Sequence, residues 1–237
     1  MFFDPLYLLL AAPGMLLGMW AQWRVRSTFS RWSQVPLSRR LTGAEIARRI
    51  LQVNGIRDVA IEPVSGMLSD HYDPRSKTLR LSPDVFQGRS VAAAGVAAHE
   101  VGHAIQHAQA YPWLSLRSSL VPVLGVTSRL AMPAIFGGFI LMSLGQAGLG
   151  QLAMLVGIAL FAVLVLFQLV TLPVEIDASR RALAAIDAGR LVTGEEYRGA
   201  RAVLSAAAWT YVAAAVASLL QLLYFLLRSG LLGGRDE

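Results

Sequence analysis

The sequence contains no cysteine, which removes several kinds of site at once. Disulfides, thiolate zinc sites and cysteine nucleophiles are all excluded. Lysine is nearly absent as well, because Lys77 is the single lysine among 21 basic residues. Histidine is also scarce, with four in the chain, so a metal site would have to combine these few imidazoles with Asp and Glu carboxylates.

Charge is scarce too, since only 15% of the 237 residues are charged while 55% are hydrophobic. This is more apolar than an ordinary soluble domain, in which apolar residues reach about half only with glycine included. The excess lies in four blocks, at residues 6–23, 120–144, 151–172 and 206–227. Each block is about long enough for a helix that crosses a bilayer. The pattern predicts a mainly α-helical integral membrane protein with about four transmembrane helices.

The loops between these blocks differ in basic charge. Residues 24–119 and 173–205 are rich in arginine, whereas 145–150 carries no charge, so 120–172 is expected to form a two-span hairpin. Four spans put both arginine-rich loops on one face, which the positive-inside tendency makes cytoplasmic. We therefore expect a multi-pass protein of the cell (inner or plasma) membrane, with a polar region at 24–118 and a helical segment at 173–205 in the cytoplasm.

The ends of the spans give further expectations. No basic region precedes block 6–23 and no cleavage site follows it, so it is predicted to be an uncleaved anchor. Arg129 lies inside the second block and would either snorkel to the interface or face protein. Pro122 and Pro133 leave the start of that helix open. The four apolar blocks make the lipid bilayer an expected partner. Nucleic acid is not expected as a partner, because basic residues do not alternate with aromatics along a stripe.

The polar region has the pattern of a small α+β domain. Thr42 and Glu45 have capping-box spacing and begin a helix at about 43–54. A strand is expected at 58–63, and a hairpin at 67–82 with its turn at residues 73–76. A short helix begins at Ser82 and Pro83, and a longer one covers 88–109. The hairpin could offer an edge strand to an extended peptide.

The longer helix contains the pattern His99-Glu100-x-x-His103 among small apolar residues. Positions four apart share one helix face, so two neutral imidazoles could bind one zinc ion there. Glu100 could accept a proton from an activated water and pass it to the leaving amine. A solvated polar patch is the alternative, but a carboxylate buried between histidines is costly unless it is paired or metal-linked. We predict one catalytic Zn²⁺ ion, with His99 and His103 as ligands and Glu100 as general base. Gly102, between the histidines, would let another backbone approach closely.

The other two histidines are weaker candidates for the site. His107 lies about 12 Å from His99 along a continuous helix, so a metal contact is not expected. A structural hydrogen bond or a substrate contact suits His107 better. His71 lies beside the predicted hairpin turn, where it could contact substrate or stabilise an oxyanion, or be an ordinary surface or core histidine.

A catalytic zinc site needs a third protein ligand and one open position. Glu175 and Asp177 follow the third apolar block at its cytoplasmic end. The two carboxylates could simply cap the helix that follows. We instead predict Glu175 as the third ligand and Asp177 as the group that accepts the outer N–H of a ligating histidine. The residues by themselves leave the reverse assignment open.

Three segments in this order are similar to a known family. HYDPRSKTLRLSPDVF, AAHEVGHAIQHA and PVEIDASRRAL together resemble the membrane-bound neutral zinc metallopeptidases of bacteria, the YugP-like family. The resemblance covers nearly the whole chain and implies a zinc-dependent, membrane-embedded endopeptidase with a cytosol-facing site. It implies that His99, His103 and Glu175 are the ligands and that Glu100 is the catalytic acid.

A more distant resemblance links the chain to the stress-linked membrane protease and CAAX prenyl protease group. In that group the third ligand is also a distal Glu, and its acidic partner follows four residues later. Here Ser179 occupies that place and Asp177 comes two residues after Glu175. The role of Asp177 therefore departs from the pattern of the distant group.

The resulting hypothesis is a gluzincin-like integral-membrane zinc endopeptidase with a small zincin-like cytoplasmic domain. Its substrates would be membrane or cytoplasm-side proteins or peptides, and further membrane proteins are possible partners. The alternative is a membrane adaptor or scaffold with a structural or peptide-binding zinc site. Glu100 separates the two, because a structural zinc site needs no general base. A transporter is not favoured, since Arg129 is the one charge within a span and lacks an acidic partner there.

Overall fold

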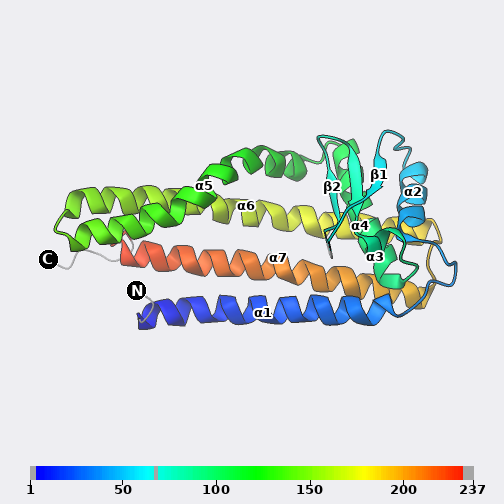
Figure 1. The fold of residues 1–237 in the computed structure, drawn as a ribbon, viewed down its shortest axis with the longest axis horizontal. Coiled ribbons are helices and arrows are strands. Elements are labelled where there is room, and N and C mark those ends of the chain that lie inside the picture. The colour runs from blue at the N-terminus through cyan, green and yellow to red at the C-terminus, as the bar shows by residue number, and fades with distance from the viewer. Residues whose placement is uncertain (1–3, 67–68, 232–237) are drawn as a thin grey trace. The chain divides into compact units, whose positions relative to one another are not determined.

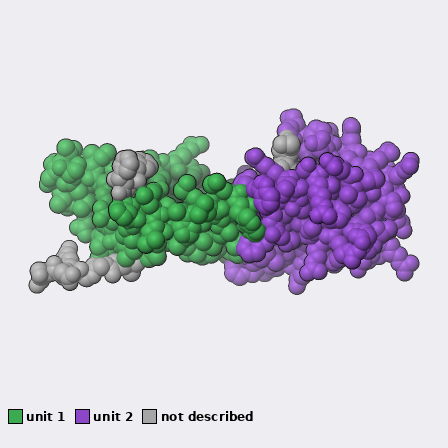
Figure 2. Space-filling model, turned by 90° about the horizontal axis from the view of Figure 1, so that it is seen from below, with its two compact units in different colours: residues 1–20, 116–172, 211–237 green, residues 21–115, 173–210 purple. Residues whose placement is uncertain are grey.

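The computed structural model describes residues 4–66 and 69–231. These form two compact units, each assembled from separate parts of the chain (Figure 2). Unit 1 comprises Met1–Trp20, Leu116–Leu172 and Tyr211–Glu237, and unit 2 comprises Ala21–Ser115 and Pro173–Thr210. The two histidines of the HExxH pattern and both candidate acidic partners belong to unit 2.

Four long helices account for the apolar blocks (Figure 1). They are α1 Pro5–Ser33, α5 Pro112–Ser143, α6 Ala147–Ala188 and α7 Gly194–Arg228. Each is long and apolar enough to cross a membrane by length and composition. The chain is thus mostly helical with four candidate membrane-spanning helices, as predicted, and every one of these helices continues beyond its apolar block. In unit 1 the core forms around Ile135, Met154, Ile158, Tyr224 and Phe225.

Helix α5 differs from the sequence prediction at its start. It begins at Pro112 and continues through Pro122 and Pro133, where we expected a start near 120 or later. Proline suits the first turn of a helix, and inside a helix it removes one hydrogen bond and bends the axis, as Figure 1 shows for α5. Arg129 lies within α5 and is exposed.

Unit 2 contains a three-stranded sheet and three shorter helices. The elements are α2 Gly43–Val53, β1 Ala60–Pro63, β2 His71–Asp73, β3 Thr78–Leu81, α3 Pro83–Phe86 and α4 Val91–Ala108. The strand order is β1-β3-β2, with β1 parallel and β2 antiparallel to β3. The predicted hairpin is therefore confirmed as β2 and β3, although its first two residues, Met67 and Leu68, lie outside the described residues. Strand β2 forms one edge of the sheet.

Local hydrogen bonds explain where two of these elements begin and turn. The Thr42 hydroxyl accepts the Glu45 N–H at 3.2 Å, and the Glu45 carboxylate accepts the Thr42 N–H at 2.8 Å, so the predicted capping box begins α2. In the hairpin turn the Asp73 carboxylate accepts the Ser76 hydroxyl at 2.7 Å and the Arg75 N–H at 2.9 Å. The Ser76 hydroxyl, followed by the Arg75 N–H, lowers the pKa of Asp73 to about 2.

Helix α4 is the central element of unit 2. Most of its side chains are buried, and its small residues allow neighbouring helices to come close. A Cβ added to Gly95 would lie 3.4 Å from the backbone of Ala200 in α7, and one added to Gly102 would lie 2.4 Å from the carbonyl oxygen of Ala178 in α6. The close approach predicted at Gly102 is confirmed, and it brings α6 directly beside the HExxH residues.

Candidate metal centre

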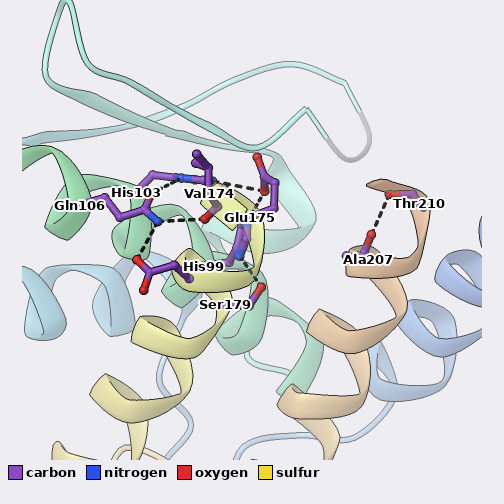
Figure 3. Close-up of polar contacts among 9 residues, drawn as sticks. His99, His103, Gln106, Val174, Glu175, Ser179, Ala207 and Thr210 are labelled. Carbon is purple, nitrogen blue, oxygen red and sulfur yellow. Dashed lines mark hydrogen bonds and ion pairs between the residues drawn. The ribbon is translucent and has the colours of Figure 1, made fainter. Parts of the chain in front are cut away.

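Helix α4 positions His99, Glu100 and His103. Ser90 caps the start of this helix, since its side chain accepts the Ala93 N–H, and the helix runs from Val91 to Ala108 without a break. His99 and His103 are therefore one turn apart, with ring centroids 4.9 Å from each other. Both rings face α6, as Figure 3 shows.

Helix α6 supplies a carboxylate between the two rings. The Oε2 atom of Glu175 lies 3.1 Å from His99 Nε2 and 3.5 Å from His103 Nε2. Possible ligand atoms of the three residues all lie within 4.8 Å of one another, and Glu175 is buried. The structure thus brings Glu175 to the histidines and leaves Asp177 further out, with its carboxylate bound to other groups.

The outer nitrogen of each ring has its own partner. His99 Nδ1 lies 3.1 Å from the Ser179 hydroxyl, and His103 Nδ1 lies 3.0 Å from Gln106 Oε1. A hydroxyl can donate or accept, so Ser179 leaves the tautomer of His99 open. An amide oxygen only accepts, so Gln106 requires the proton of neutral His103 to be on Nδ1.

This arrangement tests whether a metal ion fits. With its proton on Nδ1, His103 presents the Nε2 lone pair to the Glu175 carboxylate. The two acceptor atoms, His103 Nε2 and Glu175 Oε2, then lie 3.5 Å apart. Two acceptors this close require a shared cation or proton between them. Two imidazoles and one carboxylate form a donor set that catalytic zinc sites use. The residues present therefore fit a zinc ion, with His99, His103 and Glu175 as the groups that would hold it.

Asp177 lies outside this group and reaches it indirectly. Its Oδ2 atom accepts the Gln106 side-chain N–H at 2.9 Å, and Arg180 and Arg181 both donate to the same carboxylate. We expected Asp177 to accept directly from a ligating histidine. Ser179 and Gln106 take that place for His99 and His103, and Asp177 instead accepts from Gln106 and the two arginines.

Glu100 is buried beside His99. Burial raises the pKa of its carboxyl to about 7, and the neighbouring His99 and the Tyr72 N–H act in the opposite direction. A carboxyl with a pKa near neutrality can both take up and release a proton, which is what a general base and acid must do. The contact with the Tyr72 backbone also places strand β2 next to this carboxyl.

The two remaining histidines are not part of the group that could hold a metal. The Nδ1 atom of His107 lies 2.8 Å from the Tyr72 hydroxyl, so His107 links α4 to β2. A structural hydrogen bond was one of the two roles that the sequence left open for His107, and its contact with substrate stays a prediction. His71 is exposed on β2, and its Nδ1 donates to the Ser69 carbonyl at 2.8 Å. Its contact with substrate stays a prediction.

Sequence reasoning missed Gln106 and Tyr72. Gln106 follows His103 by three positions and therefore shares its helix face, which was a visible signal for a hydrogen-bonding partner. Tyr72 gave no comparable signal, because its contact with His107 depends on how the hairpin packs on α4.

Comparisons with known proteins identify the family of this chain. A family model described as "putative neutral zinc metallopeptidase" matches residues 7–230. The chain is also similar to "Putative membrane protease YugP" of Bacillus subtilis (strain 168), with 48% identity over 98% of both chains. No solved structure matches.

Proposed function

Because this chain belongs to the "putative neutral zinc metallopeptidase" family, we propose that it is an integral-membrane zinc endopeptidase with His99, His103 and Glu175 as metal ligands. The observation that carries the proposal is the convergence of two imidazole Nε2 atoms on one buried Glu175 oxygen, next to the buried Glu100. An intact base beside the ligands favours an enzyme over a scaffold with a structural zinc ion.

The roles of the side chains follow from their positions. A zinc ion would supply Lewis-acid activation of a water molecule and of the scissile carbonyl. Glu100 takes one proton from that water as its oxygen attacks the carbonyl carbon. Glu100 then passes the proton to the amide nitrogen as the C–N bond breaks, so the products are a carboxylic acid and an amine. Burial of Glu100 supports this role, because it keeps the pKa of the carboxyl close to neutrality.

Strand β2 is the element that would receive the substrate. It lies at the edge of the sheet, paired with β3 on one side, and its Tyr72 N–H approaches Glu100. An extended peptide that added to this edge would run past the carboxylate of the base. The hydrogen bond between Tyr72 and His107 supports this arrangement, since it ties the strand to the helix that carries the histidines.

The substrates are proposed to be membrane proteins or peptides that enter from the cytoplasmic side. The arginine-rich segments 24–119 and 173–205 supply all the candidate site residues, and basic loops favour the cytoplasmic face. We propose the cell membrane as the location for the same reason.

The test uses the full chain in detergent. Zinc content and cleavage of a casein-like substrate are measured for the wild type and for Glu100→Gln. We expect one zinc ion in both proteins and a loss of cleavage of at least 10²-fold in the variant, about the size of a general-base contribution. Zinc in both proteins, with equal and negligible turnover across several substrates, would favour the membrane scaffold.

A further inference from the structure

Gln106 is a fully buried polar side chain that connects both helices of the candidate metal centre. It extends from α4, it is completely inaccessible to solvent, and its amide makes contacts at both ends (Figure 3). The amide oxygen lies 3.0 Å from His103 Nδ1, and the amide nitrogen donates to the Val174 carbonyl at 2.8 Å and to Asp177 at 2.9 Å.

These contacts determine which way the amide points. The Val174 carbonyl and the Asp177 carboxylate are both acceptors, so they must face the NH₂ group of Gln106. The amide oxygen is then left for His103 and can only accept. His103 must therefore donate from Nδ1, and its Nε2 lone pair is directed toward Glu175 and the proposed ion.

The carboxylate of Asp177 is in turn held in place by charge. Arg181 donates to Asp177 and to Gln109, and its guanidinium lies 5.4 Å from the ring of Tyr111. Arg180 donates to the other carboxylate oxygen at 2.8 Å. Asp177 therefore presents a fixed acceptor to Gln106 and has no direct hydrogen bond with either histidine in the described structure.

We propose that Gln106 is a positioning residue that holds His103 in the metal-binding tautomer, and that Asp177 affects the metal only through Gln106. This inference rests on the proposed zinc site, but not on peptidase activity. The amide replaces the carboxylate that more commonly accepts the outer N–H of a zinc-bound histidine. The neutral amide oxygen attracts the Nδ1 proton of His103 less strongly than a carboxylate would. It therefore fixes the ring while His103 remains a neutral imidazole and does not become an anionic ligand.

The experiment measures zinc affinity of the full chain in detergent by competition with a chelator, without any substrate. Gln106→Met keeps the side-chain length and about the same volume but replaces the amide oxygen that accepts from His103 with a weakly accepting thioether sulfur. We expect zinc affinity to fall on the order of 10- to 100-fold, the usual effect of removing such a partner. Gln87→Met, in the residue that follows α3, is the matched control. It makes the same change at an exposed glutamine whose side chain has no hydrogen bond in the described structure, and zinc affinity should stay within about twofold.

A double-mutant cycle tests whether Asp177 acts through Gln106. Asp177→Ala alone should weaken zinc binding, because the amide loses one of the two acceptors that orient it. In the Gln106→Met background the same change should alter zinc affinity by no more than about twofold, since the connection is already broken. Equal effects of Asp177→Ala in both backgrounds would refute the connection.

A charge swap covers the case in which Gln106→Met does not fold. Gln106→Glu combined with Asp177→Asn keeps an acceptor for His103 and a donor–acceptor pair between the two positions. This double variant should bind zinc more tightly than either Gln106→Met or Gln106→Glu alone. Zinc affinity that is unchanged in folded Gln106→Met, or a swap that binds no better than Gln106→Glu, would overturn the inference. A protein that binds zinc in this pattern yet cleaves nothing would instead count against the proposed peptidase function.

Discussion

Gly102 of α4 lies against the backbone of Ala178 in α6, so closely that a Cβ on Gly102 would lie 2.4 Å from the Ala178 carbonyl oxygen. The two helices can meet there because α4 has no side chain at position 102. The same contact brings Glu175, one turn before Ala178, beside His99 and His103. The geometry of the metal group thus depends on one glycine.

Gly102→Ala should therefore disturb the metal group as well as the fold. The methyl group would force α4 and α6 apart, with a loss of about 1–3 kcal/mol in stability, as is usual for overpacking. We expect lower zinc content and a lower midpoint of thermal unfolding. Gly125→Ala in α5 is the control, because a Cβ there meets nothing within 4 Å. A folded Gly102→Ala protein with full zinc content would contradict the role given to this contact.

Replacement of the two acidic residues should separate their roles. Glu175→Ala removes an oxygen close to both histidine Nε2 atoms, and we expect the purified protein to contain almost no zinc. Asp177→Ala should weaken zinc binding by about tenfold or more but not abolish it, because Asp177 acts from outside the ligand group. Metal analysis of both variants after equal dialysis makes the comparison. The opposite order would mean that Asp177 is the ligand.

The bond between Tyr72 and His107 should matter for substrate and not for metal. Tyr72→Phe removes a hydrogen bond worth about 0.5–1.5 kcal/mol and loosens β2 from α4. We expect a higher KM, by up to about tenfold, with unchanged zinc content. Kinetics with a peptide substrate and metal analysis test this. His107→Ala should likewise retain zinc, and loss of zinc in that variant would show that His107 reaches the metal.

The hairpin between β2 and β3 should weaken in acid because of Asp73. Its pKa is lowered from 3.8 to about 2 by the turn, so the ionised carboxylate stabilises the folded hairpin. This stabilisation is complete above pH 3.8 and declines as the pH falls toward 2. Asp73→Asn should speed hydrogen exchange of residues 71–81 at neutral pH, and the difference from the wild type should shrink between pH 4 and pH 2. A difference that stays constant over this range would exclude the carboxylate as its cause.

Local patterns in the sequence predicted much of this molecule. Four apolar blocks predicted the four candidate membrane-spanning helices, since a helix that spans a bilayer needs a long apolar run wherever it packs. The capping box at Thr42 and the hairpin turn at Asp73 were predicted for a similar reason, because each forms between residues a few positions apart. The start of α5 was not predicted. A long apolar helix can tolerate an internal proline, and the sequence alone does not show at which positions it does so.

The sequence by itself determined which side chains are available for the chemistry. Without cysteine, any zinc site had to be built from His, Asp and Glu side chains, and the spacing of His99 and His103 put them on one helix face. Only the tertiary structure decided between Glu175 and Asp177 as their partner and placed Gln106 between Asp177 and His103. That choice depends on how α6 packs against Gly102, which is a contact between residues far apart in the chain. Such contacts are set by the shape and closeness of two surfaces, and no local pattern in the sequence specifies them.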